Sequence, residues 1–204
     1  MPLGDAEVVN MALSHIGIGS EVSSVETEAS QEAQAARRFL GPAREEILRS
    51  FPWPFATKFA VLGLVATAPT EIDEEWGFSY RYPSDCVKLR RIRSGSRNDT
   101  HETRVPYKIG QDTDGLLIYT DFQTAEIEYT KRETNMARWP YDATLALSYR
   151  LAAYFAPRLT DGDPRQMRIL VAQLYRLSLQ VAQANALGEE QHDTVPKSDL
   201  ENAR

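Results

Sequence analysis

Apolar residues recur along this chain with two different periods, and each change of period marks a change of predicted structure. Near the N-terminus, Val9, Leu13 and Ile16 are spaced as on one face of a helix. Asp5 is its predicted cap, because a carboxylate at that position accepts from unpaired backbone amides. Gly17 is predicted to end the helix, because glycine takes the left-handed closing conformation at little cost.

A second helix is predicted over residues 31–50, with Thr27 or Ser30 at its start. Its expected buried positions are Ala36, Phe39, Leu40, Ala43, Ile47 and Leu48. Pro42 lies inside this run. Because proline removes one backbone donor and crowds the preceding turn, we expect a kink or a short break there.

From residue 55 the apolar period changes to two, which is the period of a β-strand. Large aromatic residues alternate with small or polar ones over residues 76–82. A hairpin is predicted where residues 105–109 and 116–119 flank a turn with Gly115 at its bend. Further strand-like runs are residues 55–61, 87–91 and 125–130. No crossover helix separates these five or six strands, so we expect an antiparallel sheet.

The helical period returns after residue 140 and predicts two more helices. The first is apolar on more than one side, so we expect it to be buried. The second begins with Asp163 as cap and Pro164 as first helical residue, and ends at Gly188. Its predicted buried stripe is Met167, Leu170, Val171, Leu174, Leu177, Val181, Ala184 and Leu187. Its predicted solvent-exposed face comprises Arg165, Arg168, Gln173, Arg176, Gln180 and Gln183.

These elements predict an α+β fold, made of a bundle of about four helices with an inserted antiparallel β region and a flexible C-terminal tail. The bundle comprises residues 1–54 and 139–187, the β region residues 55–138, and the tail residues 188–204. The tail holds five acids and few large aliphatic residues. Such a segment cannot offset its own ordering entropy, so we expect it to be flexible until a partner binds it.

Composition narrows the class of protein. Of 204 residues, 42% are apolar and 25% are charged, as in ordinary soluble globular proteins. A net charge of −6 disfavours tight DNA binding, which needs excess positive charge. Cys86, the single cysteine, cannot form an internal disulfide, and this predicts a reducing compartment. No apolar run approaches the ~20 residues of a membrane span, and no signal-peptide pattern opens the chain, so we expect no membrane association.

No residue pattern points to catalysis, so we expect no enzyme activity, no cofactor and no metal. His15, His101 and His192 lack the spacing of metal ligands. Residues 112–115 resemble part of a calcium loop but lack its downstream glutamate, and a hairpin turn explains them better. Residues 73–75, which are Asp-Glu-Glu, could supply paired carboxylates for glycoside hydrolysis. Consecutive acids in a loop are more often a solvated surface.

A basic stretch follows the aromatic strand and comprises Lys88, Arg90, Arg91, Arg93 and Arg97. Strand alternation would place Lys88 and Arg90 on one side, and Val87, Leu89 and Arg91 on the other. Two interpretations stay open. The stretch could contact an acidic neighbouring subunit or passing DNA, or it could be a solvated edge strand protected by positive charge.

Three segments in order resemble the head-to-tail adaptor proteins of short-tailed bacteriophages, the family also called tail tubular protein A. They are residues 9–17 (VNMALSHIG), 42–56 (PAREEILRSFPWPFA) and 76–87 (WGFSYRYPSDCV). Tyr82 stands where the family usually has an aliphatic residue, and Pro54 where asparagine is common. The order of helices and strands also matches, so the resemblance covers residues 5–187.

The resemblance implies a structural virion protein in the phage tail, assembled in the host cytoplasm. About twelve copies would form a ring between the portal protein and the tail nozzle protein, around a conduit for the genomic DNA. The helices would build the ring and the β region would project from it. The acidic net charge suits a conduit that DNA must cross without binding.

Two sets of residues acquire expected roles from the resemblance. The tail residues that would contact the portal are His192, Val195, Pro196 and Leu200. The motif residues with expected structural roles are Pro52, Trp53, Trp76, Pro83 and Asp85. The alternatives are a virion-associated cell-wall or polysaccharide hydrolase that uses residues 73–75, and an interaction module unrelated to viruses.

Overall fold

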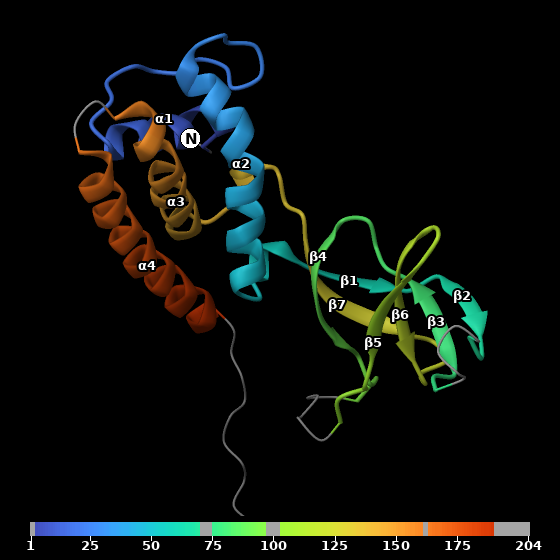
Figure 1. Ribbon diagram of the computed structural model, residues 1–204. Coiled ribbons are helices and arrows are strands. Elements are labelled where there is room, and N and C mark those ends of the chain that lie inside the picture. The colour runs from blue at the N-terminus through green and yellow to red at the C-terminus, as the bar shows by residue number, and fades with distance from the viewer. Residues whose placement is uncertain (1–2, 70–74, 97–102, 161–162, 190–204) are drawn as a thin grey trace, which may run out of the picture.

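The computed structural model describes residues 3–69, 75–96, 103–160 and 163–189, and it has helices at both ends of the chain with antiparallel strands between them (Figure 1). The fold is therefore mixed α+β, as predicted. The helices are α1 (Asp5–His15), α2 (Gln31–Ser50), α3 (Tyr141–Leu159) and α4 (Pro164–Glu189). The strands are β1 (Thr57–Val61), β2 (Leu64–Thr67), β3 (Phe78–Arg81), β4 (Cys86–Ile92), β5 (Lys108–Asp112), β6 (Gly115–Thr120) and β7 (Glu126–Lys131).

Local side chains explain where the helices begin. Ser30 Oγ accepts a hydrogen bond from the backbone N–H of Ala33 at 3.3 Å and caps α2. Asp163 caps α4 as predicted, because its Oδ1 accepts from the amides of residues 165 and 166 at 3.0 and 3.2 Å. The prediction for Asp5 is wrong. Gly4 is the cap of α1, and its N–H donates to Glu7 Oε2 at 2.8 Å.

α2 continues through Pro42 as one helix, so of the predicted kink or break the break does not occur. Gly41 and Pro42 lie on its exposed side. Water can therefore reach the carbonyl of Arg38, which loses its usual helical partner to the proline ring. The opposite face of α2 packs Leu40 and Ala43 into the core, and this packing holds the helix together across the proline.

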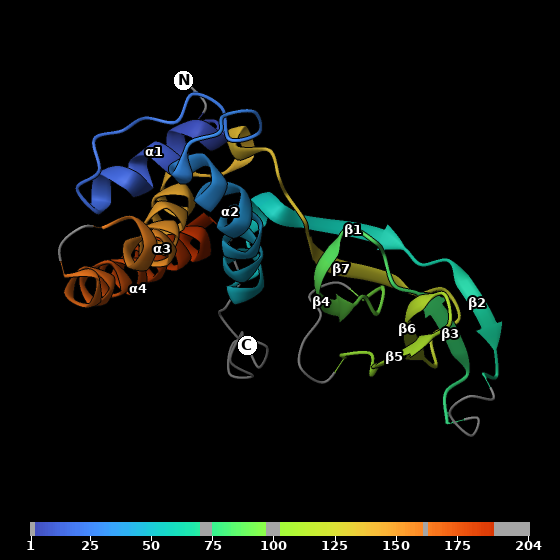
Figure 2. The same cartoon turned by 45° about the horizontal axis from the view of Figure 1, so that its top comes forward.

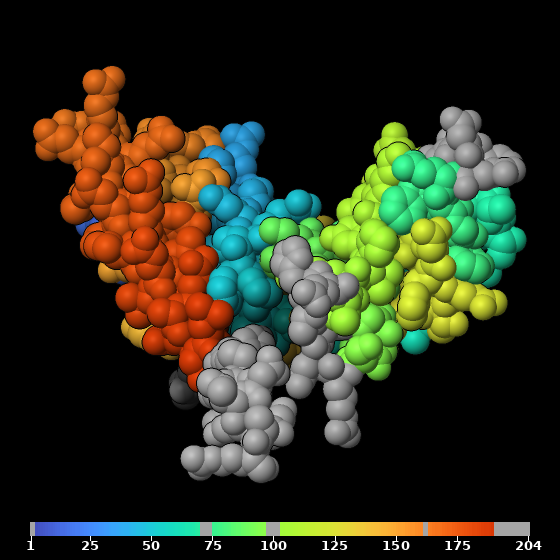
Figure 3. All heavy atoms as spheres, turned by 90° about the horizontal axis from the view of Figure 1, so that it is seen from below, coloured from blue at the N-terminus to red at the C-terminus, as the bar shows by residue number. Residues whose placement is uncertain are grey.

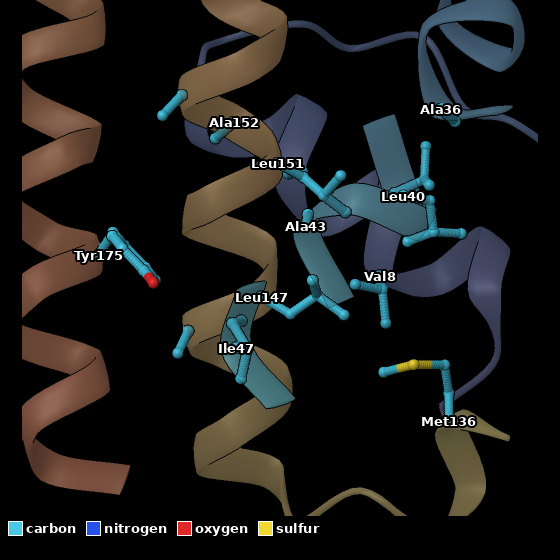
Figure 4. Packing of buried hydrophobic residues seen from close by; sticks show 14 of the residues in the cluster. Val8, Ala36, Leu40, Ala43, Ile47, Met136, Leu147, Leu151, Ala152 and Tyr175 are labelled. Carbon is cyan, nitrogen blue, oxygen red and sulfur yellow. The ribbon is translucent and has the colours of Figure 1, made fainter. Parts of the chain in front are cut away.

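α3 is the central helix of the bundle, because α4 covers one of its sides and α1 and α2 cover the other (Figure 4). Leu147, Leu151 and Phe155 have no exposed surface. Small residues between them, such as Ala146 and Ala152, let the neighbouring helices approach closely. The prediction that this helix is buried on more than one side is confirmed.

α4 departs from its predicted pattern in two ways. It runs through Gly188 to Glu189, so Gly188 does not end it. Its buried residues are Val171, Tyr175, Ala182 and Ala186, and most of the predicted buried stripe lies outside this set. Within the described ranges, no helix combines the length and apolar character that a membrane span requires.

Two antiparallel sheets make up the described part of the β region. Their strand orders are β1-β7-β4 and β2-β3-β6-β5, and every pairing is antiparallel, as predicted. The chain bends from the first sheet into the second at Leu62 and Gly63, which separate β1 from β2. Side chains of both sheets meet in a second core, which includes Leu62, Tyr80, Leu89, Ile118, Ile127 and Tyr129.

β4 contradicts the predicted sidedness of the basic stretch. Val87 packs into the core of the helices whereas Leu89 packs into the core of the sheets, so the two residues do not share a side. The register of β4 against β7 shifts between Cys86 and Lys88 and again between Leu89 and Arg91. Such irregularities redirect the following side chains, and simple alternation cannot anticipate them.

Two segments of the chain cross between the helices and the β region (Figure 2). An aromatic cluster joins the two parts there. Trp53 is 1% exposed, and its Nε1 donates to the carbonyl of Ile47 at 2.7 Å. Trp139, on the returning segment, donates from Nε1 to the carbonyl of Glu133 at 3.2 Å. The Phe55 ring lies 5.8 Å from the ring of Trp53 and 5.1 Å from that of Trp139. Both crossing segments therefore share one cluster.

We predict that Trp53→Ala lowers the free energy of unfolding by about 3–5 kcal/mol, because it opens a cavity at the junction. Trp53→Phe is the matched control. It keeps most of the packing and leaves the Ile47 carbonyl without its indole donor, so its cost is about 1–3 kcal/mol. Urea denaturation followed by far-UV circular dichroism measures both. Equal stability of Trp53→Ala and the wild type would contradict the role given to this cluster.

Candidate functional site

The outward face of α4 carries large apolar side chains that the rest of the chain leaves uncovered. Leu170, Leu177 and Val181 are 51%, 60% and 57% exposed. Their spacing of seven and four residues places them on one side of the helix. Ile169 and Leu187 extend the same surface and are each 54% exposed. We call these five residues the α4 face.

The α4 face is open because α4 packs mainly against α3, on its other side. The residues that meet α3 include Val171, Ala182 and Ala186, which are small and allow close packing. Figure 3 shows α4 along the outer edge of the molecule, with α2 on the side toward the β region. Contiguous exposed apolar patches on soluble proteins mark interaction surfaces.

The charged residues of α4 are arginines, apart from Glu189 at its C-terminal end. Arg165, Arg168 and Arg176 are exposed along the helix. No acidic residue occurs between residues 164 and 188. The α4 face is therefore apolar with a basic margin, and its complement would be apolar with an acidic margin.

A groove lies on the other side of the bundle, between α2 and the segment that follows β7. It has a volume of about 670 Å³. Its lining is Gly41, Pro42, Arg44, Glu45, Glu46, Leu48, Arg49, Arg132, Glu133 and Thr134. We call this feature the α2 groove.

Ion pairs hold the walls of the α2 groove in place. Glu133, only 5% exposed, accepts from Lys131 Nζ at 2.6 Å and from Arg138 at 3.2 Å. Burial raises the pKa of Glu133, but these donors outweigh burial and the net pKa is lowered. Glu46 accepts from Arg150 Nε of α3 at 2.7 Å. The groove is thus a preformed feature with fixed charges.

The residues that the sequence offered as catalytic or metal-binding candidates contact other residues of the chain wherever the structure describes them. Glu75 is exposed and pairs with Lys108 at 3.2 Å, whereas Asp73 and Glu74 lie outside the described residues. His15 Nε2 lies 3.0 Å from Ser148 Oγ, and partial burial lowers its pKa. His101 and His192 lie outside the described ranges, within which no cluster of three metal-ligating side chains occurs.

The hairpin predicted at residues 112–115 is confirmed, with Asp112 paired to Gly115 across a two-residue turn. Arg81 donates two hydrogen bonds of 2.8 Å to the Asp112 carboxylate. These bonds lower the pKa of Asp112 to about 2, from an ordinary value of 3.8. The Asp112 carboxylate therefore has a structural role, because its bonds to Arg81 connect β5 to β3.

The basic stretch makes internal contacts along the edge strand β4. Arg90 donates to the carbonyls of Leu48 and Phe51 at the C-terminal end of α2. Arg91 and Arg93 pair with Glu128 and Glu126 of β7 at 2.7 and 2.8 Å. These contacts favour the edge-strand interpretation over a free DNA-binding surface. Arg97 lies outside the described residues.

The motif residue Asp85 ends the turn that begins at Pro83 and connects three strands. Its two carboxylate oxygens accept from Tyr129 at 2.9 Å and from Lys58 at 2.8 Å. Burial raises the pKa of Asp85, but these two donors outweigh burial, so the net pKa is lowered. Trp76 is half-buried just before β3. The candidate portal contacts His192, Val195, Pro196 and Leu200 lie outside the described residues.

Comparisons with known proteins add no assignment. No protein-family model matches this chain. No curated protein matches it significantly either. The candidate site therefore depends on the geometry described above and on the sequence motifs.

Neither the α4 face nor the α2 groove was predicted from the sequence, although each is accompanied by an unusual residue pattern. Around the helix, Leu170 and Leu177 lie about 120–160° from the buried pair Tyr175 and Ala182, so the apolar stripe is too wide for one neighbour. In α2, the exposed Gly41 beside a proline is a poor choice for a helix interior. Both signals become interpretable only once the packing partners are known.

We predict that Asp112→Asn removes part of the acid dependence of stability. The lowered pKa means that the folded state binds this proton less readily than the unfolded state does. The stabilisation is therefore complete above about pH 5 and is lost as the pH falls toward about 2. Thermal unfolding at several pH values measures this. The control Asp114→Asn should follow the wild-type profile, and an unchanged profile for Asp112→Asn would contradict the assignment.

Proposed function

We propose that this protein is a head-to-tail adaptor of a short-tailed bacteriophage virion, and that its copies form a ring between the portal protein and the tail nozzle. The three sequence motifs support this proposal through their order and spacing. The observation that carries it is the α4 face, since a monomer has no use for several half-exposed leucines on one helix. The partner proposed for this face is a second copy of the same chain.

The division of the chain supports the same function. The helices form one core and the strands another, so each part can act as a separate structural unit. The aromatic cluster at Trp53, Phe55 and Trp139 connects the two parts. In the proposed ring the helices pack side by side, and the β region projects toward a neighbouring layer of the tail. DNA would pass through the ring on its way out.

The number of equal contacts determines the stability of such a ring. Each copy contributes two interfaces, and closure makes the last contact intramolecular. No single interface therefore needs to be tight. This is consistent with a face of five apolar side chains rather than an extensive buried core.

We predict that the double variant Leu170→Asp, Leu177→Asp abolishes self-association, because it places two carboxylates in the apolar contact. Sedimentation velocity and negative-stain electron microscopy of the purified protein, alone and with portal, measure ring formation. Leu116→Asp is the matched control, because Leu116 is a leucine of similar exposure (46%) in the β region. Rings from the double variant, or a wild type that never assembles even with portal, would refute the proposal.

We predict that truncation after Glu189 leaves the helices and sheets intact and weakens attachment to the portal. The removed segment carries the candidate contacts Val195 and Leu200, while the described core ends within α4. Circular dichroism tests the fold, and co-sedimentation with purified portal tests attachment. Substitution of both aliphatic residues by serine in the full chain is the finer variant. Undiminished portal binding by both forms would exclude the proposed role of the tail.

A further inference from the structure

We infer that the α4 face of one copy packs into the α2 groove of the next copy, so that self-association is head-to-tail. This inference rests on the proposed function and specifies which surfaces meet. Three observations carry it: the arginines beside the α4 face, the loosely paired Glu45 at the α2 groove, and the open backbone of that groove at Gly41.

Two α4 faces are poor partners for each other. Arg165 and Arg176 flank the α4 face and would approach the same two residues of the second copy, and no acid between residues 164 and 188 could offset them. Such an isologous contact would also stop at a dimer, because it uses the same surface on both copies. A ring needs two different surfaces on each copy.

The segment that contains α1 and α2 has an excess of acids. Residues 1–56 contain eight acids and four arginines. The acids are Asp5, Glu7, Glu21, Glu26, Glu28, Glu32, Glu45 and Glu46. α3 separates this side of the bundle, with α1 and α2, from α4, as Figure 4 shows. This segment therefore has a net negative charge, whereas α4 carries three arginines and one acid, Glu189, at its end.

The α2 groove lies on this side of the bundle, and three glutamates and three arginines line it. Gly41 and Glu45 follow each other at a spacing of four residues, on the face of α2 that points away from Leu40, Ala43 and Ile47. A Cβ added to Gly41 would meet no atom within 4 Å. The backbone of α2 is thus open to close approach by another helix.

The groove also has acidic groups at its rim. The side chain of Glu45 is 37% exposed and pairs only loosely, at 3.4 Å with Arg49 and 3.9 Å with Arg132. An arginine of α4 can join this network, while Leu177 and Val181 enter the groove. Because the α4 face and the α2 groove are different surfaces of one chain, each bound copy leaves one of each free, and addition continues until the ring closes.

Mixing two variants tests the inference. The α4 variant Leu170→Asp, Leu177→Asp retains an intact groove, and Gly41→Arg fills the groove with bulk and positive charge while retaining an intact α4 face. We expect each variant alone to be monomeric and an equimolar mixture to form a one-to-one dimer in sedimentation velocity. Gly19→Arg is the matched control, because Gly19 is exposed, a Cβ there would also meet no atom within 4 Å, and it does not line the groove, so this variant should assemble as the wild type does.

Other outcomes overturn the inference and leave the proposed ring standing. Wild-type assembly by Gly41→Arg would exclude the groove as the seat of α4. Dimers of Gly41→Arg alone would indicate an isologous contact between α4 faces. Normal rings of Gly41→Arg that no longer bind nozzle protein would assign the groove to that partner. Absence of wild-type assembly would instead refute the proposed function itself.

A charge reversal supplies a second test that does not depend on filling the groove. Glu45→Arg and Arg176→Glu should each weaken self-association at least about tenfold, because each places like charges across the contact. The double variant should restore association to within about threefold of the wild type. Sedimentation at increasing salt concentration provides the control, because a contact of opposite charges weakens with salt. Additive losses in the double variant would contradict the pairing.

Discussion

The architecture of the helices depends on the burial of α3. A single helix with apolar residues on nearly all sides must be covered by several neighbours, and here α4 covers one side while α1 and α2 cover the other. Each outer helix meets α3 with one face, which leaves its opposite face outside the core. For α4 that opposite face holds Leu170, Leu177 and Val181, and for α2 it holds Gly41 and Glu45. The two candidate surfaces thus follow from the central position of α3.

The β region is attached to this bundle through a small number of specific contacts. The cluster of Trp53, Phe55 and Trp139 joins the two crossing segments, and Arg90 of β4 donates to the last carbonyls of α2. A cation at the C-terminal end of a helix is favourable because the unpaired carbonyls there carry partial negative charge. The register shifts in β4 make this contact possible, since they direct Val87 toward the helices and Leu89 toward the sheets.

Much of the fold could be predicted from the sequence because local signals decide it. Ser30 and Asp163 cap their helices through their own side chains, and the turn before Gly115 produces its hairpin. Apart from the first residue of α1 and the last residue of α4, the wrong predictions concern features that distant parts of the chain determine. Alternation could not show the shifted register at Cys86, which depends on β7, and periodicity could not show which side of α4 meets α3. The candidate site lies on surfaces that the fold leaves uncovered, so it became visible only with the packing known.

The unfavourable features of the two surfaces support the idea that they belong together. Exposed leucines on α4 lose the stabilisation that burial would provide, about 1.5–3 kcal/mol for each side chain fully buried. Glycine in the interior of a helix costs about 1 kcal/mol relative to alanine, and proline about 3. A chain that functioned alone would gain stability by replacing Gly41, Pro42 and Leu177 with ordinary helix-forming polar residues. In a head-to-tail ring the same residues become the apolar contact and the close approach between helices. The features that weaken the isolated chain would then stabilise the assembly.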